Sequence, residues 1–182
     1  MKKELDEKLC AKYPLIFKDR NASMQSTAMC WGFECGDGWY NILDVLCAHL
    51  SFDYNRAKND YDRIKDKVDQ PRWKGSDKIV TQASIDEART KLDEETLKVP
   101  IATQVKEKFG GLRFYVSGAS DKQYNYISFA ESMSYRTCEE CGAQGRLYTD
   151  GWHKTLCSVH ALKNGREETD ANLEHDVSSS DT

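Results

Sequence analysis

Two short pairs of metal-type ligands, Cys138-Glu-Glu-Cys141 and Cys157-Ser-Val-His160, decide how the C-terminal third of this chain folds. The first is a CxxC, the second is a CxxH, and fifteen residues separate them. Each pair bends around one point, and a loop of this length brings the pairs together, as a tetrahedral zinc site requires. Thiolate and imidazole suit the borderline softness of Zn²⁺. We therefore expect a structural zinc ion held by Cys138, Cys141, Cys157 and His160.

The residues between the two pairs indicate the type of finger. Residues 146–149 and 152–156 are typical of short strands on either side of an Asp150-Gly151 turn. A helix then opens at Cys157, so that its first turn supplies the last two ligands. Knuckle, hairpin and helix in this order predict a treble-clef-like or zinc-ribbon finger over residues 136–163.

Four protein ligands close the coordination sphere, which argues against catalysis at the metal, because a catalytic zinc keeps one position open for water. A redox role for the CxxC is disfavoured, since no thioredoxin-like strand and helix adjoin it. A nucleobase deaminase would need an HxE or CxE upstream of a PCxxC, and no PCxxC is present. His153 is a weaker ligand candidate, because it lies within a predicted strand and has no paired partner. We expect no enzymatic activity.

Residues 100–117 carry the clearest strand signal. Apolar residues alternate with polar or small ones on both sides of Phe109-Gly110-Gly111, whose glycines suit the positive φ angles of a tight hairpin turn. The apolar face is expected to hold Ile101, Thr103, Val105, Leu112, Phe114 and Val116.

The opposite face of this hairpin is a candidate binding surface. Cations beside an aromatic ring are what phosphates and bases require, so this face is a candidate contact for an anion, a nucleotide or a nucleic acid. The alternative, which we favour, is a solvent-facing sheet whose charges prevent edge pairing. The candidate residues are Lys106, Lys108, Arg113 and Tyr115.

Helical periodicity surrounds the hairpin. We expect a helix in the segment 4–17, which Pro14 ends. Further helices are expected from Asp37 as N-cap to about residue 50, over 84–98 with Ser84 and Glu87 as a capping box, and over 121–135. The apolar face of the second helix should hold Trp39, Ile42, Leu43, Val45, Leu46 and Leu50. The last helix should pack on the hairpin through Tyr126, Ile127, Phe129, Ala130 and Met133. These elements predict an α+β body over residues 1–135.

Residues 53–98 differ in composition from the rest of the body. They hold 11 basic and 11 acidic residues, interleaved along a helical stripe that Pro71 and Gly75 interrupt. Interleaved signs are typical of a solvated face. We expect an inserted pair of exposed helices that lies over the core.

Three further observations concern cysteine chemistry. The chain has seven cysteines, an odd number that argues against a closed disulfide framework. Cys30 and Cys35 are weak candidates for a second metal site, because their spacing is longer than structural sites use. Cys10 and Cys47 are expected to be buried core thiols. Cysteine catalysis at Cys35 is disfavoured, because no histidine is placed to act as its base.

The charge is divided along the 182 residues. The whole chain carries a net charge of −4; residues 164–182 contribute −5 (six acidic residues against Arg166), which leaves +1 for the remainder. We expect a disordered acidic tail over 164–182. The near-neutral body is less basic than general nucleic-acid binders. No apolar window approaches the roughly 20 residues of a membrane span, and no secretory signal is evident, so we expect a cytoplasmic protein without membrane contact.

Several phrases of the body resemble a family of small bacteriophage and prophage proteins with a C-terminal CxxC/CxxH finger. They are Lys12-Tyr-Pro-Leu-Ile-Phe17, Cys35-Gly-Asp-Gly-Trp39 and Lys106-Glu-Lys-Phe-Gly-Gly-Leu-Arg-Phe-Tyr115. The resemblance implies a phage or bacterial cytoplasmic setting and transfers no activity to particular residues.

These observations favour a non-catalytic, zinc-binding protein that binds a protein of the bacterial host, as an inhibitor of a defence or regulatory system. The candidate anchors for such a partner are Trp31, Trp39, Trp73 and Trp152, with burial in the core as the alternative for each. The alternative is nucleic-acid or nucleotide binding through the basic face of the 101–117 hairpin and the finger.

Overall fold

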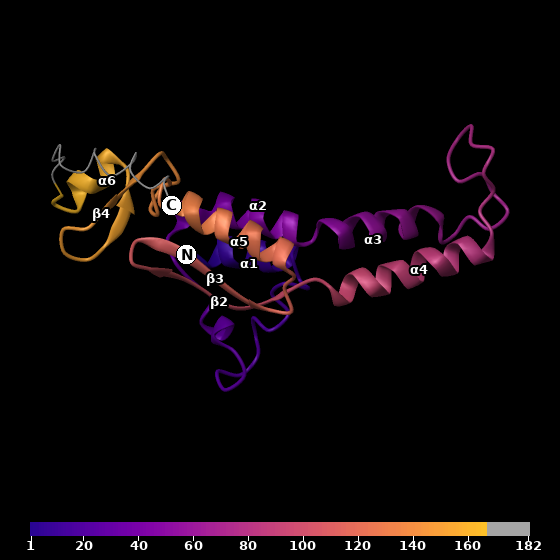
Figure 1. Cartoon of the computed structure of the whole chain (residues 1–182), viewed down its shortest axis with the longest axis horizontal. Coiled ribbons are helices and arrows are strands. Elements are labelled where there is room, and N and C mark those ends of the chain that lie inside the picture. The colour runs from indigo at the N-terminus through magenta and orange to yellow at the C-terminus, as the bar shows by residue number, and fades with distance from the viewer. Residues whose placement is uncertain (167–182) are drawn as a thin grey trace, which may run out of the picture.

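Six α-helices and two small sheets form residues 1–166, the part of the chain described by the structure, a computed structural model. The helices are α1 (Lys3–Lys12), α2 (Tyr40–Leu50), α3 (Phe52–Ile64), α4 (Gln82–Leu97), α5 (Asp121–Ser134) and α6 (Ser158–Lys163), with short 3-10 helices η1 (Ala28–Trp31) and η2 (Asp37–Trp39). The strands are β1 (Phe33–Glu34), β2 (Ile101–Lys108), β3 (Gly111–Ser117), β4 (Arg146–Tyr148) and β5 (Lys154–Leu156). The architecture is α+β, as the sequence predicts. Figure 1 shows a central body between the α6 region at one end and the projecting α3 and α4 at the other.

The predicted hairpin is formed by β2 and β3, and β1 adds a short parallel strand beside β2. Phe109–Gly110 makes the turn at φ 55° and 78°, the positive angles that a two-residue hairpin needs. The predicted alternation was wrong at its start, because the register shifts at Thr103. This bulge turns both Ala102 and Val105 into the core, whereas Ile101 and Thr103 are only half buried.

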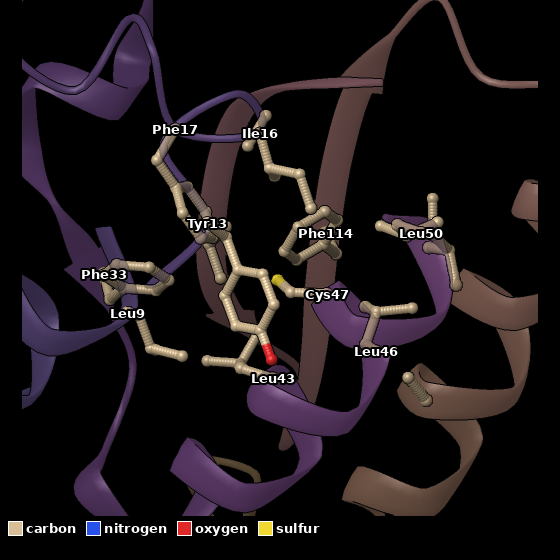
Figure 2. Close-up of a cluster of buried hydrophobic side chains, with 14 of the residues drawn as sticks. Leu9, Tyr13, Ile16, Phe17, Phe33, Leu43, Leu46, Cys47, Leu50 and Phe114 are labelled. Carbon is tan, nitrogen blue, oxygen red and sulfur yellow. The ribbon is translucent and has the colours of Figure 1, made fainter. Parts of the chain in front are cut away.

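The main core lies between the sheet and helices α1, α2 and α5, and Figure 2 shows its centre. The ring of Phe17 packs edge-on against Phe33 at 5.0 Å and against Phe114 at 6.3 Å between centroids. Trp39 is fully buried, as is Leu43 one turn later. Each large apolar side chain buried in this way contributes roughly 1.5–3 kcal/mol. The body therefore has a substantial core that involves no metal.

The helix ends differ from the predicted ones. Helix α1 ends at Lys12, next to the predicted stop at Pro14, so residues 15–17 of the predicted segment lie outside the helix. Helices α2 and α4 begin at residues that differ from the predicted ones. Asp37 does not cap α2, because its carboxylate accepts a hydrogen bond from the amide of Lys2 at 2.7 Å. Helix α4 begins one turn earlier than predicted, since the capping box is formed by Thr81 and Ser84.

Helix α5 packs on the sheet through fewer residues than its apolar pattern predicts. Ile127 and Ala130 are buried, but Phe129 is 69% exposed and Met133 is 40% exposed. Val45 of α2, which the sequence also assigns to the core, is 57% exposed. The apolar stripe of each helix is wider than the surface that covers it, so the surplus side chains face solvent.

Helices α3 and α4 form the charged pair predicted within residues 53–98, but they do not lie over the core. They project from the body as an arm, with the connecting loop at its far end (Figure 1). A small cluster of Ile64, Val80 and Ile85 holds the tip of the arm. Arg72 of the loop binds the carboxylate of Asp60 at 2.7 Å. Solvent on both sides of the pair accounts for its interleaved charges.

One ion pair fixes the irregular segment between α1 and β1. Arg20 donates to both carboxylate oxygens of Asp6, at 2.9 and 3.0 Å, and to the carbonyl oxygen of Cys30 at 3.0 Å. Burial of the Asp6 carboxyl opposes its ionisation, but the hydrogen bond and charge of Arg20 prevail and lower the pKa of Asp6. The pair thus ties helix α1 to the loop that leads into η1.

The finger extends further than residue 163, where we placed its end. Arg166, predicted to lie in the disordered tail, is buried and donates to Asp150 Oδ1 at 2.8 Å and to the Asp150 carbonyl oxygen at 3.0 Å. Its guanidinium lies 5.9 Å from the centre of the Tyr148 ring. The remainder of the predicted tail, residues 167–182, lies outside the described residues.

We expect Asp6→Asn to destabilise the body by roughly 1–3 kcal/mol at pH 7, because it leaves Arg20 without its counter-charge. The folded-state pKa of Asp6 is lowered from its ordinary value of 3.8. The contribution of the pair is therefore fully present above that value and is lost as the pH falls through the lowered pKa. Urea unfolding from pH 7 to pH 3 measures both effects, and the two proteins should converge only at the acid end.

The matched control is Asp62→Asn, which removes an exposed pair with Lys58 on α3 and should leave the unfolding midpoint unchanged. Equal effects of the two substitutions, or a difference between wild type and Asp6→Asn that grows with acidification, would contradict a structural role for the Asp6–Arg20 pair.

Candidate metal centre

The first ligand pair lies on a tight backbone turn. The amide of Cys138 donates to the carbonyl oxygen of Ala143, and the amide of Gly142 donates to the carbonyl oxygen of Cys138, both at 2.8 Å. Gly142 adopts φ 78°, a left-handed angle that favours glycine. This turn directs the side chains of Cys138 and Cys141 toward one point.

The second pair lies where the β4–β5 hairpin meets α6. Strands β4 and β5 pair antiparallel, and β5 ends immediately before Cys157. Cys157 is the N-cap of α6, and His160 lies in the first turn of that helix. The order of turn, hairpin and helix is the predicted one.

The four predicted ligands come together in space. Their donor atoms all lie within 4.8 Å of one another. Nδ1 of His160 is 3.2 Å from Cys157 Sγ and 3.5 Å from Cys138 Sγ, and the Cys141 and Cys157 sulfurs are 3.8 Å apart. The group can therefore hold a metal ion, with three sulfur ligands and one nitrogen ligand.

The surroundings of Cys157 favour its metal-binding thiolate, whereas at Cys141 a backbone hydrogen bond is outweighed by burial and by the neighbouring sulfurs of Cys138 and Cys157, which raise the pKa of Cys141. The backbone amide of His160 hydrogen-bonds to Cys157 Sγ and lowers the pKa of Cys157 to about 7, so its thiolate is well populated at neutral pH. Because Nδ1 of His160 faces the sulfurs, Nε2 faces outward, where Glu140 Oε2 lies 3.6 Å away. A carboxylate in this position can orient a ligating imidazole.

The finger has little core of its own. Its buried apolar cluster consists of Cys138, Tyr148, Leu156 and Ala161. So few side chains do not offset the conformational entropy that the segment loses on ordering. The finger must therefore be held by other interactions, which are its contact with the body and, we propose, metal coordination at the four-residue group.

That contact is made chiefly through backbone atoms. The amide of Gly38 donates to the carbonyl oxygen of Glu139 at 2.7 Å, and the amide of Gly36 donates to Glu139 Oε1 at 2.9 Å. Nε1 of the buried Trp39 donates to the carbonyl oxygen of Thr137 at 2.8 Å. These three hydrogen bonds hold the cysteine turn against the segment that joins β1 to α2.

Gly38 allows this close approach. A Cβ atom at this position would lie 2.1 Å from the carbonyl oxygen of Cys138 and 2.4 Å from the amide nitrogen of Gly142. A second contact joins the β4–β5 hairpin to the body, where Thr155 Oγ1 donates to the carbonyl oxygen of Gly110 at 2.6 Å. The finger is thus held to the body at two separate places.

The predicted anion-contact residues lie together on the outer face of β2 and β3. Lys106 pairs with Arg113 across the strands, and its Nζ is 5.7 Å from the centre of the Tyr115 ring. Arg113 is already occupied, because its guanidinium donates to the hydroxyl of Tyr135 at 2.8 Å and to a backbone carbonyl. Lys108 follows on the same face, beside the turn. Only the lysines and Tyr115 thus remain as candidates to contact a ligand from this face.

The remaining cysteines lie apart from the candidate metal centre. Within residues 1–166, no group of three or more close potential ligands includes Cys30 or Cys35. Burial raises the pKa of Cys35 and of Cys10 to about 12 and that of Cys47 well above its ordinary value. Protonated thiols are poor metal ligands, which favours core thiols at these positions. A second site at Cys30 and Cys35 stays a prediction.

The sequence predicted the four residues that the structure brings together. It did not predict that the cysteine turn lies against residues 36–39 of the body. The pattern Cys35-Gly-Asp-Gly-Trp39 enters the sequence analysis through Cys35 as a disfavoured nucleophile, through Asp37 as an N-cap and through the resemblance, but not as a contact surface. Its alternating glycines were the available signal, because glycine often marks a close approach of two backbones. The partner of that approach, the turn at Cys138, lies about 100 residues away in the sequence.

Comparisons with known proteins assign no family to this fold and site. No protein-family model, curated protein or solved structure matches the chain. None of the helices in residues 1–166 combines the length and the apolar character needed to cross a bilayer. Any assignment of function therefore rests on the geometry of the molecule itself.

We expect Cys141→Ser to abolish stoichiometric metal binding, because three remaining ligands leave the sphere incomplete; the affinity should fall more than about 100-fold. Cys141 is exposed, so the substitution creates no cavity. Elemental analysis of the purified protein and thermal unfolding with and without a chelator measure the effect. Ser158→Ala is the control, because Ser158 is exposed and lies between two of the four residues without belonging to the group; it should keep both the metal and the melting temperature. Full metal content in Cys141→Ser would rule out this ligand set.

We expect Gly38→Ala to cost about 1–3 kcal/mol or more, because the added methyl group overlaps the backbone of the cysteine turn. The control is Gly75→Ala at φ 83°, where nothing lies within 4 Å and the cost is only the left-handed backbone, about 1–2 kcal/mol. Denaturant unfolding of the metal-loaded proteins compares the two. If Gly75→Ala proves the more damaging, the finger does not dock on this segment as described.

Proposed function

We propose that this chain is a non-catalytic binding protein, stabilised by a structural zinc ion, that accepts a protein partner in the groove between α2 and α5. The observation that carries the proposal is an open apolar groove of about 620 Å³ beside these helices. Its lining includes no Asp, Glu, Lys or Arg. The lining residues are Asn41, Ile42, Val45, Leu46, His49, Tyr126, Phe129, Ala130, Met133, Thr137 and Gly142.

Three of these side chains are poorly explained by folding alone. Phe129, Met133 and Val45 are exposed by 69%, 40% and 57%. Apolar side chains gathered around one groove mark interaction sites more often than scattered ones do. They lie at the helical spacing of neighbouring turns, with Phe129 and Met133 four residues apart on α5.

The chemistry of the groove selects the class of partner. A nucleic acid requires cations for its phosphates, and the groove lining supplies none. An amphipathic helix instead lays its apolar face into a hydrophobic groove, and the uncharged lining between α2 and α5 offers such a groove. We propose such a helix, carried by another protein, as the occupant.

Zinc is the ion that we propose for the candidate metal centre. Three thiolates and one imidazole are the ligand types that structural zinc sites use, and four protein ligands leave no position for a substrate or a reactive water. We classify the finger as treble-clef-like, since a helix supplies the last two ligands. The role of the ion is to hold the finger together and to keep the cysteine turn docked at the end of the groove, where Gly142 lies.

The setting that we propose follows the resemblance to phage and prophage proteins. The partner would then be a protein of the bacterial host, bound stoichiometrically in the host cytoplasm, and the consequence of binding would be inhibition of a defence or regulatory system. This setting rests on sequence resemblance alone, whereas the choice of a protein partner rests on the groove.

The test is affinity capture from bacterial lysate, nuclease-treated and untreated side by side, with wild type, Phe129→Glu and Tyr124→Glu. Tyr124 is an equally suitable control, because it is an exposed aromatic on the same helix, outside the groove. We expect one protein to be captured by wild type and Tyr124→Glu but not by Phe129→Glu. Titration with that purified protein should then show at least about tenfold weaker binding to Phe129→Glu.

Three results would contradict the proposal. Capture that Phe129→Glu retains would place the partner elsewhere, and capture that nuclease abolishes would identify a nucleic acid. Self-association of wild type in sedimentation equilibrium, abolished by Phe129→Glu, would show that the occupant is a second copy of this chain. Thermal unfolding of each variant excludes misfolding as the cause of any loss.

A further inference from the structure

A second, chemically different recess lies between the β2–β3 turn and the loop of the β4–β5 hairpin. It has a volume of about 500 Å³. Its two walls belong to the body and to the finger, and they are held in register by the hydrogen bond from Thr155 Oγ1 to the carbonyl oxygen of Gly110. The lining residues are Lys106, Glu107, Lys108, Phe109, Gly151, Trp152 and His153. We call this recess the inter-hairpin cleft.

Two large aromatic rings at the inter-hairpin cleft are left uncovered. Phe109 is 63% exposed on the body wall, and Trp152 is 74% exposed on the finger wall. The ring of His153 lies edge-on to Phe109, with centroids 6.3 Å apart and planes inclined by 61°. Exposed aromatic faces on neighbouring loops are the platforms on which unpaired bases stack.

The presence of phenylalanine at position 109 opposes local backbone preference. Phe109 is the first of the two turn residues, at φ 55°, a position that favours Asn, Asp or Gly. A bulky side chain at this angle costs free energy, and its exposure means that the core gains little from it. Folding therefore does not explain a phenylalanine at position 109, whereas a ligand that stacks on the ring would explain it.

Two unpaired cations accompany the rings. Lys106 Nζ lies 5.7 Å from the centre of the Tyr115 ring, and Lys108 Nζ lies 5.3 Å from that of Phe109. Within the described part of the chain, neither lysine forms an ion pair. Glu107, the acidic residue of the lining, is engaged, because its Oε1 accepts the amide of Gly110 at 2.6 Å. The inter-hairpin cleft therefore offers cations beside exposed rings.

We propose that the inter-hairpin cleft binds single-stranded nucleic acid, with bases stacked on Phe109 and Trp152 and phosphates held by Lys106 and Lys108. A single strand is favoured over a duplex, because paired bases present no free face to a ring. An acidic peptide would satisfy the lysines but would leave both aromatic faces unused. This site is separate from the α2–α5 groove and does not depend on the partner proposed for it.

The test is fluorescence anisotropy of a labelled oligothymidine of about 12 nucleotides, within the usual range of site sizes, titrated with the metal-loaded full chain. Phe109→Asn is the most informative variant, because asparagine suits the turn and removes only the ring. We expect Phe109→Asn and Trp152→Ala each to weaken binding roughly 5- to 150-fold. The thermal midpoint of Phe109→Asn should equal or exceed that of wild type.

The lysines are tested through the salt dependence of binding. Each phosphate contact on a single strand contributes about 0.7 to the slope of log affinity against log salt. Lys106→Ala and Lys108→Ala should each reduce that slope by about this amount. The control is Trp73→Ala, an exposed tryptophan in the loop at the far end of the arm, which should bind like wild type.

Four outcomes would overturn the proposal. The first is absence of binding by the wild-type chain at low salt, and the second is unchanged affinity in Phe109→Asn and Trp152→Ala. The third is tighter binding of a duplex than of a single strand of the same length. The fourth is a loss of affinity in Trp73→Ala that matches the loss in Trp152→Ala. Competition by a polyglutamate peptide without competition by unlabelled oligonucleotide would likewise identify an acidic peptide as the ligand and overturn it.

Discussion

The organisation of this protein depends on one contact between two backbones, where the turn at Cys138 lies on the segment Gly36–Trp39. The amides of Gly36 and Gly38 and the indole of Trp39 supply its hydrogen bonds, and the missing side chain of Gly38 supplies the space. Main-chain groups in such a contact need partners as soon as they leave water. The contact therefore forms only when the cysteine turn has its bent shape. We propose that metal coordination at the two ligand pairs maintains that shape, since the apolar cluster of the finger is too small to do so.

The two proposed binding surfaces adjoin the two places where the finger contacts the body. The α2–α5 groove ends at Thr137 and Gly142, in and beside the cysteine turn. The inter-hairpin cleft has one wall on the body and one on the finger. A finger that moved away from the body would shorten the groove and open the cleft. We propose that an ion at the candidate metal centre would act on both surfaces through the position of the finger, at a distance from either ligand. The arm formed by α3 and α4 lies outside this coupling.

The sequence predicted what short-range spacing determines and missed what distant contacts determine. The four ligands and the β2–β3 hairpin follow from local patterns of cysteine, histidine and glycine, and the structure has them where they were expected. The helix pair within residues 53–98 was expected over the core, but charge pattern alone does not tell an arm from a cover. Phe129 and Met133 were assigned to the core because periodicity gives the width of an apolar stripe but not the width of the surface that meets it. The role of Gly38 was missed because its partner at Cys138 lies far along the chain.

Hydrogen exchange at the amide of Gly38 tests the central claim most directly, because this amide donates to the carbonyl oxygen of Glu139 within the cysteine turn. The amide of Val80, which donates to Gln70 at the tip of the arm, is the internal reference. Removal of the metal by a chelator should speed exchange at Gly38 at least about 100-fold, while exchange at Val80 stays unchanged. Full protection of Gly38 in the metal-free protein would show that the finger docks without coordination, and it would contradict the account.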